Sequence, residues 1–247
     1  MKRALATAAV LCVLAAACGS GAAADVVVVS AAASLTDAFT EMAAAFEAAH
    51  PDVEIALNFA GSSALREQIV AGAPVDVLAT ANELTMRQAS DAGVLAAEPE
   101  VFAVNELAIV VPRSNEAGVV GLRDFADPQL FVGLCAESVP CGVLAREVLA
   151  AAGVRPSIDS SEPDVRSLLT KVAAGELDVG LVYLTDIAVR ADEVAGIDLP
   201  AELDAASRYP IALVADSPNP DLGQAFIDFV ATDAGREIML SHGFGPP

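Results

Sequence analysis

The sequence contains no tryptophan and only two histidines, and aromatic residues make up just 4% of its 247 residues. Proteins that hold sugars or bases by ring stacking usually carry more, so the composition argues against carbohydrate and nucleic-acid ligands. Basic residues are also scarce, with 13 lysines and arginines against 34 acidic residues. Such a surface repels nucleic acid and anionic membranes. The 55% share of apolar residues nevertheless indicates a globular protein with an ample core.

Motifs of the common enzyme classes are absent from the sequence as well. It has no helix-borne His-Glu zinc motif, no Walker loop and no Gly-x-Ser-x-Gly elbow. A Ser/His/Asp hydrolase would depend on His50 or His242, and both positions are typical of solvated surface histidines. Cys135 and Cys141 do not match Cys-x-x-Cys redox spacing. We therefore expect no enzyme, and a secreted thiol or serine enzyme is a less favoured alternative.

The first 24 residues are typical of an export signal followed by a linker. A basic start precedes a short apolar run over residues 4–17, which is too short to span a membrane. Residues 14–18 resemble a bacterial lipoprotein cleavage box, although Ala15 replaces the usual large aliphatic residue. We expect an exported chain that a lipid on Cys18 anchors to the outer face of the cytoplasmic membrane. Cleavage near Ala24, which would discard Cys18, is the alternative.

The four cysteines divide between the signal and the mature chain. Cys12 would leave with the signal and Cys18 would carry the lipid. Cys135 and Cys141 would remain in an oxidising compartment, which favours a disulfide between them. A metal site is the weaker alternative, because neither histidine lies near this pair in the sequence.

Strand and helix patterns alternate along most of the chain after the signal. Residues 26–30 form a β-branched run typical of a buried strand, and residues 34–50 have apolar positions at helical spacing. Ser34 and Asp37 predict a capping box at the start of this helix. Further strands are predicted over 53–59, 75–80, 106–111, 131–135, 177–183 and 211–215, and further helices over 62–71, 141–152, 164–174 and 221–232. These β–α units predict an α/β fold with mostly parallel sheets flanked by helices.

Four short segments share one form, in which a strand ends, small or polar residues follow, and a helix begins. They are residues 30–34, 60–63, 139–142 and 162–165. A helix N-terminus offers free backbone N–H groups and the positive end of a dipole, which makes it suited to anions. One such segment is usually an ordinary helix cap. Four of them, gathered at the carboxyl edge of parallel sheets, indicate an anion site.

Seven motifs carry a resemblance to a known family through their order and spacing. They are Ala31-Ala-Ala-Ser-Leu35, Phe59-Ala-Gly-Ser-Ser-Ala-Leu65, Gln68-Ile-Val-Ala-Gly-Ala-Pro-Val-Asp76, Val139-Pro-Cys-Gly142, Asp164-Val-Arg166, Gly180-Leu-Val-Tyr183 and Gly243-Phe-Gly-Pro246. Over nearly all of residues 25–247 the chain resembles the molybdate-binding proteins of ABC importers. The resemblance implies a two-lobed periplasmic-binding-protein fold, similar to type II, with the ligand cleft between the lobes.

The resemblance also implies how the chain is divided between the lobes. Residues 1–24 would be the signal peptide and lipidated linker. Lobe 1 would contain residues 25–103, lobe 2 would contain residues 104–208, and residues 209–247 would return to lobe 1.

Five residues would hold the oxyanion through neutral hydrogen-bond donors, as the resemblance implies. Hydroxyl groups would come from Ser34, Ser62 and Tyr183, and backbone N–H groups from Cys141 and Val165. Two further possible contacts are Ala33 and Ser63. Cys141 stands where the family commonly has alanine, a change that a backbone donor tolerates.

Neutral donors reconcile an anionic ligand with the charge of the chain. Without the signal, 11 basic residues stand against 34 acidic ones, a net charge of −23. A fully deprotonated dianion requires only donors, and each charge-assisted hydrogen bond contributes roughly 1.5–3 kcal/mol. Phosphate, which is partly protonated at neutral pH, would want a carboxylate acceptor, and we expect none in the four segments. The expected ligand is therefore molybdate or tungstate, bound without a cofactor or a bare metal ion.

The prediction as a whole is a monomeric solute-binding protein that closes over one oxyanion and delivers it to an ABC permease. It would bind no nucleic acid. The nearest alternative is the same class of protein with sulfate or another small anion as ligand. A secreted enzyme and a surface adhesion module are alternatives from other classes.

Overall fold

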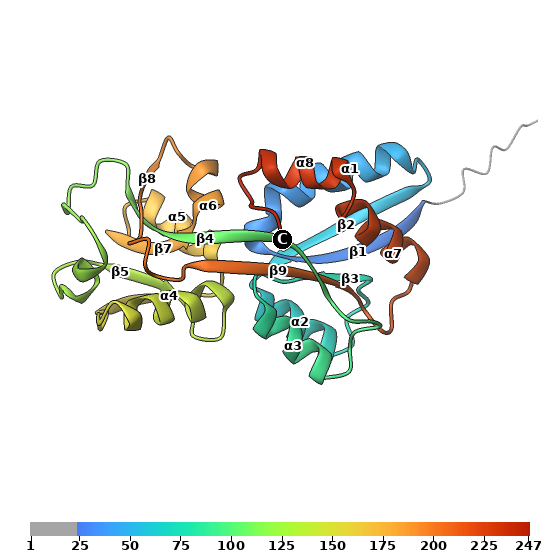
Figure 1. The fold of residues 1–247 in the computed structure, drawn as a ribbon, viewed down its shortest axis with the longest axis horizontal. Coiled ribbons are helices and arrows are strands. Elements are labelled where there is room, and N and C mark those ends of the chain that lie inside the picture. Colours follow the sequence, from blue (N-terminus) through green and yellow to red (C-terminus); the bar gives the residue numbers. More distant parts are fainter. Residues whose placement is uncertain (1–23) are drawn as a thin grey trace, which may run out of the picture.

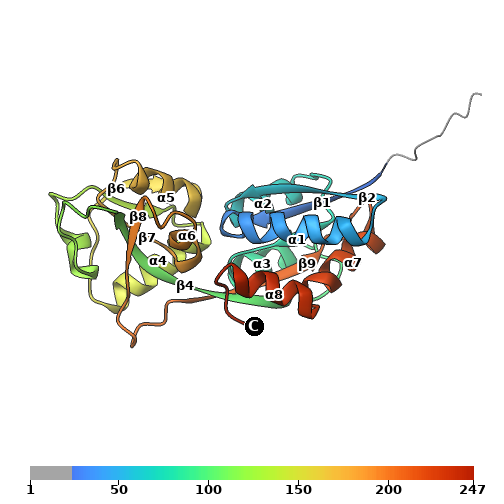
Figure 2. The same cartoon turned by 90° about the horizontal axis from the view of Figure 1, so that it is seen from above.

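The computed structural model describes residues 24–247. The predicted signal peptide and the lipid on Cys18 lie outside the described residues. The chain forms two lobes, each a sheet covered by helices, and strands β4 and β9 run from one lobe into the other (Figures 1 and 2). The predicted two-lobed α/β fold is thereby confirmed.

Lobe 1 contains three parallel strands in the order β2-β1-β3. Its strands are β1 (Asp25–Ala32), β2 (Val53–Ala60) and β3 (Val77–Ala79). Its helices are α1 (Thr36–Ala49), α2 (Ser62–Val70), α3 (Glu83–Asp91), α7 (Pro220–Val230) and α8 (Asp233–Ser241). Helices α1, α7 and α8 cover one face of the sheet and α2 and α3 the other (Figure 1).

Aromatic and aliphatic side chains fill the two faces of lobe 1 differently. Phe39 and Phe46 of α1 meet Phe226 of α7 edge to face, with ring centroids 6.0 and 5.5 Å apart, and all three are fully buried. Under α2 and α3, a smaller aliphatic cluster contains Leu65 and Met86. The helical apolar spacing of the sequence thus becomes the packing that holds α1 and α2 in place at the ends of β1 and β2.

Lobe 2 repeats the same design with β5 at the centre of a parallel β6-β5-β7 arrangement. Its strands are β5 (Val132–Cys135), β6 (Ile158–Glu162), β7 (Val179–Tyr183) and β8 (Val194–Ile197). Its helices are η2 (Leu122–Ala126, a 3₁₀-helix), α4 (Pro140–Ala151), α5 (Val165–Ala173) and α6 (Leu184–Val189).

Two antiparallel strands connect the lobes. They are β4 (Glu100–Pro112) and β9 (Ala206–Leu213), which pair from Glu100 opposite Ile211 to Glu106 opposite Ala206. Strand β9 continues into the lobe 1 sheet beside β3, and β4 continues into the lobe 2 sheet beside β7. Among the described strands, every antiparallel pair involves β4 or β9. The predicted lobe boundaries, at residues 103/104 and 208/209, fall within this paired segment.

The predicted capping box at Ser34 and Asp37 is wrong. Ser34 lies in a short 3₁₀ turn, η1 (Ala33–Leu35), and α1 begins afterwards at Thr36 without a side-chain cap. The hydroxyl of Ser34 instead lies 2.9 Å from the hydroxyl of Tyr209 on β9. Tertiary contacts therefore recruit a side chain that local rules assign to the helix.

The predicted strands and helices are present, although β4 and β9 begin six and five residues before their predicted starts. Besides the 3₁₀ turns η1 and η2, five further helices and strands were not predicted. They are α3, α6, α8, β6 and β8. Strand β6 has the polar sequence IDSSE and is largely exposed at the sheet edge, and α3 buries only three of its nine residues. Elements with so few apolar positions give no clear periodicity.

Candidate ligand-binding site

A small cavity lies between the lobes, where the four predicted strand-to-helix segments converge. The space that it leaves for the centre of a water-sized molecule is only about 10 Å³. Pockets for drug-sized ligands are larger, roughly 300–1,000 Å³. The cavity therefore suits a small ion and is too small for a sugar or a peptide.

All five predicted donor residues line this cavity. They are Ser34, Ser62, Cys141, Val165 and Tyr183. Ala33, predicted as a possible contact, lines it too. Ser63 is buried but is not among the lining residues. Ser34 and Ser62 come from lobe 1 and the other three donors from lobe 2, so the set is complete only when the lobes meet.

The hydroxyl of Ser62 is oriented by its own neighbours. Ser62 is the first residue of α2, and its Oγ accepts a hydrogen bond of 3.0 Å from the backbone N–H of Ala81. Since the oxygen acts as an acceptor there, the hydroxyl proton is available to donate into the cavity. The backbone N–H of Ser62 belongs to the first helical turn, where no earlier carbonyl of the helix can accept from it.

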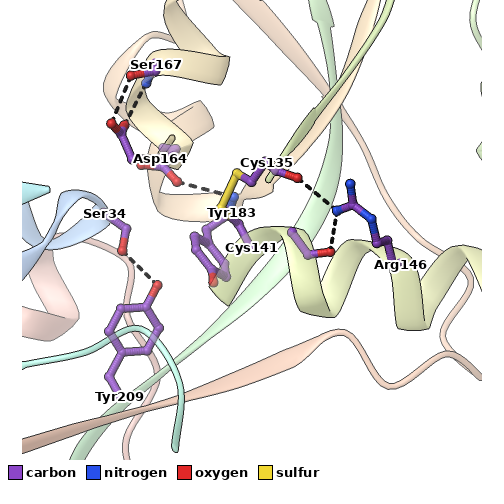
Figure 3. The surroundings of a disulfide bond; sticks show 10 residues. Ser34, Cys135, Cys141, Arg146, Asp164, Ser167, Tyr183 and Tyr209 are labelled. Carbon is purple, nitrogen blue, oxygen red and sulfur yellow. Dashed lines mark hydrogen bonds between the residues drawn. A yellow bond between two sulfur atoms is a disulfide. The ribbon is translucent and has the colours of Figure 1, made fainter. Parts of the chain in front are cut away.

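A second tyrosine, Tyr209 on β9, forms a hydrogen bond with the hydroxyl of Ser34. Its hydroxyl lies 2.9 Å from the Oγ of Ser34, and Figure 3 shows the two hydroxyl groups pointing toward each other. Burial raises the pKa of Tyr209 well above its usual value, so the phenol keeps its proton. If Tyr209 donates to Ser34, the proton of Ser34 is left for the cavity. Sequence reasoning did not identify Tyr209, although the chain has only two tyrosines and both lie here.

Tyr183 presents a polar group that the protein itself leaves unpaired. Its side chain is only 1% exposed, and among the described residues its hydroxyl forms no hydrogen bond of good geometry, although Ser207 and Tyr209 lie near enough to lower its pKa slightly. Burial is the main cause that raises the pKa of Tyr183 above its usual range, so the group is a neutral donor at neutral pH. An unpaired buried hydroxyl costs about 1–3 kcal/mol. Since Tyr183 lines the cavity, a ligand that accepts a hydrogen bond from its hydroxyl would remove that cost.

Two helix N-termini supply the remaining donors. Pro140 is the first residue of α4, which places Cys141 in its first turn, and Val165 is the first residue of α5. Their N–H groups precede the point at which intrahelical acceptors become available. Both residues are almost fully buried, so their N–H groups lie in a site that excludes bulk water.

The segment before α5 does contain a carboxylate at the cavity, contrary to expectation. Asp164 is the N-cap of α5 and lines the cavity. One oxygen of its carboxylate accepts from the backbone N–H of Ser167 at 2.8 Å and the other from the Ser167 hydroxyl at 2.9 Å (Figure 3). Both oxygens are therefore already engaged in capping the helix, the role that Asp most often has at this position.

A disulfide between Cys135 and Cys141 fixes the segment before α4, as predicted. It joins the end of β5 to the first turn of α4, with the two Cα atoms 5.9 Å apart. Gly142 fits against the same backbone, because a Cβ there would lie 2.0 Å from the carbonyl oxygen of Ala136. Arg146 donates to the carbonyl oxygens of Cys135 and Gly142, both at 2.9 Å (Figure 3).

None of the described residues that line the cavity is a lysine or an arginine. Arg166 directly follows the cavity-lining residue Val165, but two carboxylates bind it. Its Nη2 lies 2.6 Å from Asp37, and its Nε lies 2.6 Å from Asp186. The Nε contact is an ion pair that lacks hydrogen-bond geometry. Asp186 is fully buried, and this burial raises its pKa to about 6 although Arg166 opposes the shift.

Within residues 24–247 there is no group of three or more His, Cys, Asp or Glu residues that could hold a metal ion. Over the same residues, no helix is both long and apolar enough to cross a membrane.

Two lobes joined by two strands, with a small donor-lined cavity between them, define a solute-binding protein. The model of the bacterial extracellular solute-binding protein family matches residues 27–245, and the chain belongs to this family. Its relatives are solute-binding proteins rather than enzymes, which places it in an extracytoplasmic class.

Particular relatives narrow the comparison further. The molybdate-binding protein ModA of Mycobacterium tuberculosis (strain ATCC 25618 / H37Rv) is 37% identical over 221 residues, which cover 90% of this chain and 85% of that protein. A putative ABC transporter substrate-binding lipoprotein of Bacillus subtilis (strain 168) is 28% identical and covers 87% of this chain and 85% of that protein. The solved periplasmic molybdate-binding protein of Azotobacter vinelandii shares the fold, with a TM-score of 0.74 at 16% identity over 90% of this chain and 99% of that chain. The predicted resemblance to molybdate-binding proteins is confirmed.

Proposed function

We propose that this protein captures molybdate or tungstate outside the cytoplasm and delivers the oxyanion to an ABC permease. The observation that carries the proposal is the unpaired, buried hydroxyl of Tyr183 at a small cavity without cations. A relative 37% identical over 90% of the chain is named a molybdate-binding protein, which supports the same ligand here.

The ligand would be held by donors from both lobes. Ser34, Ser62 and Tyr183 would each donate a hydroxyl hydrogen bond, and Cys141 and Val165 would each donate a backbone N–H. A dianion accepts from all of them and needs no acceptor in return. Phosphate carries a proton at neutral pH. Among the described residues that line the cavity, the one carboxylate is that of Asp164, which already accepts two hydrogen bonds from Ser167 as the cap of α5.

Closure would bring these donors together. We propose that the lobes hinge where the paired strands β4 and β9 pass from one lobe into the other, close to residues 103/104 and 208/209. Residues 25–103 and 209–247 would then move as one lobe and residues 104–208 as the other. The protein would act as a monomer. A lipid on Cys18 would keep it close to the permease, which agrees with the lipoprotein name of the Bacillus subtilis relative.

Calorimetry with molybdate, tungstate, sulfate and phosphate tests the proposal. We expect one site, with molybdate and tungstate bound far more tightly than phosphate. A thermal-shift screen gives an independent readout, since a ligand at 100 times its dissociation constant adds about 2.7 kcal/mol to the free energy of unfolding. Phosphate binding as tight as that of molybdate would contradict the donor-only site. Tighter sulfate binding would select the alternative ligand, and an absence of binding by all four anions would overturn the proposal.

A further inference from the structure

Two direct contacts join the lobes at or beside the cavity, and neither belongs to the proposed donor set, although Gly61 itself lines the cavity. Asp37 on α1 of lobe 1 forms an ion pair with Arg166 on α5 of lobe 2, at 2.6 Å. Gly61, between β2 and α2 of lobe 1, lies against the carbonyl of Pro163, between β6 and α5 of lobe 2. We propose that these two contacts set the closed arrangement of the lobes and thereby determine how long the ligand is retained. The inference rests on the proposed function, and it assigns Asp37, Arg166 and Gly61 as positioning residues.

Arg166 connects the lobe interface to two of the proposed donors. It directly follows Val165, and its Nε pairs with the buried carboxylate of Asp186. The other oxygen of Asp186 accepts from the backbone N–H of Tyr183 at 3.3 Å. One guanidinium group therefore holds the start of α5 and the end of β7 in a fixed relation while it reaches across to Asp37.

The two ion pairs of Arg166, with Asp186 and with Asp37, would respond differently when the lobes move apart. Arg166 and Asp186 are both in lobe 2, so their contact survives when the lobes separate. Asp37 is in lobe 1, so its contact with Arg166 exists only in the closed arrangement. A contact made in one state alone shifts the equilibrium toward that state. Since the side chains of Arg166 and Asp37 are 23% and 38% exposed, the pair is partly shielded from solvent and should exceed an exposed surface pair in strength.

Gly61 contributes through its lack of a side chain. Its backbone angles, φ −60° and ψ 134°, are open to any residue, so conformational freedom does not explain the glycine. A Cβ at this position would lie 2.4 Å from the carbonyl oxygen of Pro163, and the three nearest atoms all belong to Pro163 and Asp164 in lobe 2. The added methyl group would therefore collide with the opposite lobe and hold the two lobes apart.

Stopped-flow measurement of molybdate association and dissociation on the full chain tests both contacts. Asp37→Asn removes the ion pair with Arg166 that joins the two lobes. We expect molybdate to dissociate about three- to tenfold faster, while its association rate changes less than about twofold. Glu41→Gln is the matched control, because it removes the same charge one turn later on α1, where the carboxylate pairs with His242 of the same lobe. Its rates should stay within about twofold of wild type.

Gly61→Ala tests the second contact without removing a donor. We expect dissociation to become at least about tenfold faster, since a collision at 2.4 Å forces the lobes apart. Gly121→Ala is its control, because a Cβ at Gly121 meets nothing within 4 Å. In small-angle scattering, molybdate should reduce the radius of gyration of the wild type more than that of Gly61→Ala. Thermal unfolding of the ligand-free variants confirms that each remains folded.

The outcomes separate this inference from the proposed function. If wild-type protein fails to bind molybdate, the proposed function itself is wrong. If wild-type protein binds molybdate while Asp37→Asn and Gly61→Ala both dissociate at the wild-type rate, the inference about closure is overturned and the proposed function stands. Equal acceleration by Glu41→Gln and Asp37→Asn would also overturn it, because the effect would then come from charge alone.

Discussion

Replacing Tyr183 with phenylalanine separates a ligand contact from a structural one. The change deletes one hydroxyl group and keeps the ring, which packs edge to face on Tyr209 with the centroids 5.8 Å apart. In the ligand-free protein the hydroxyl forms no hydrogen bond of good geometry among the described residues, with Ser207 and Tyr209 as its nearest polar neighbours. Its removal should therefore leave the free energy of unfolding unchanged or raise it, because an unpaired buried polar group is lost.

The affinity for molybdate should change in the opposite direction. A hydrogen bond to a charged group contributes about 1.5–3 kcal/mol. Since each 1.4 kcal/mol corresponds to a tenfold change in dissociation constant, Tyr183→Phe should weaken binding by about 10- to 150-fold. Calorimetry measures the affinity, and chemical denaturation of the ligand-free protein measures the stability.

Tyr209→Phe provides the comparison, because Tyr209 already has a partner in the protein. Loss of its contact with Ser34 should lower the free energy of unfolding by about 1 kcal/mol and reduce affinity less than Tyr183→Phe does. The reasoning fails if Tyr183→Phe binds molybdate as tightly as wild type. It also fails if Tyr183→Phe is markedly less stable than wild type, since its hydroxyl would then have a structural role.

Four further predictions address the donors, the disulfide, the charge and the buried acid. Ser34→Ala and Ser62→Ala should each lose about 1–3 kcal/mol of binding free energy in calorimetry with the fold intact, and unchanged affinity in both would reject these donors. Cys135 and Cys141 are six residues apart, and reducing the disulfide between them should lower the free energy of unfolding by about 2 kcal/mol in denaturation experiments. Two free thiols in mass spectra of the exported protein would refute the bond. Raising chloride should leave molybdate dissociation unchanged and association unchanged or modestly faster in stopped flow, because the net charge, −21 for the whole sequence, repels the anion at long range. A steep fall in the association rate would show that cationic side chains attract the anion toward the cavity. The pKa of Asp186 is about 6 in the folded protein against 3.8 ordinarily, so the folded state binds this proton more tightly. The free energy of unfolding should therefore fall by roughly 3 kcal/mol in total as pH rises from about 3 to about 7. Asp186→Asn should lack that component of the pH profile in denaturation experiments, and an identical profile in both proteins would refute the assignment.

The sequence by itself determined the elements with strong periodicity and the chemistry of their ends. Residues 26–30 and 34–50 specify a buried strand and an amphipathic helix, because burial imposes a period of two or of about 3.6 on the side chains. The sequence also places serines and small residues before helices, which predicts an anion site built without cations. Cys135 and Cys141 are close enough along the chain that their pairing follows from an oxidising compartment.

Only the tertiary structure decided which of these features work together. Ser34 meets Tyr209 across 175 residues, and Asp37 meets Arg166 across 129, so no local pattern contains either pair. The closed lobes give Gly61 its close contact with Pro163, which nothing in its own segment requires. Local periodicity fixes where strands and helices form, since each residue responds to its near neighbours in the chain. The partners of single polar side chains depend on how the lobes pack, because burial brings together groups that the sequence keeps far apart.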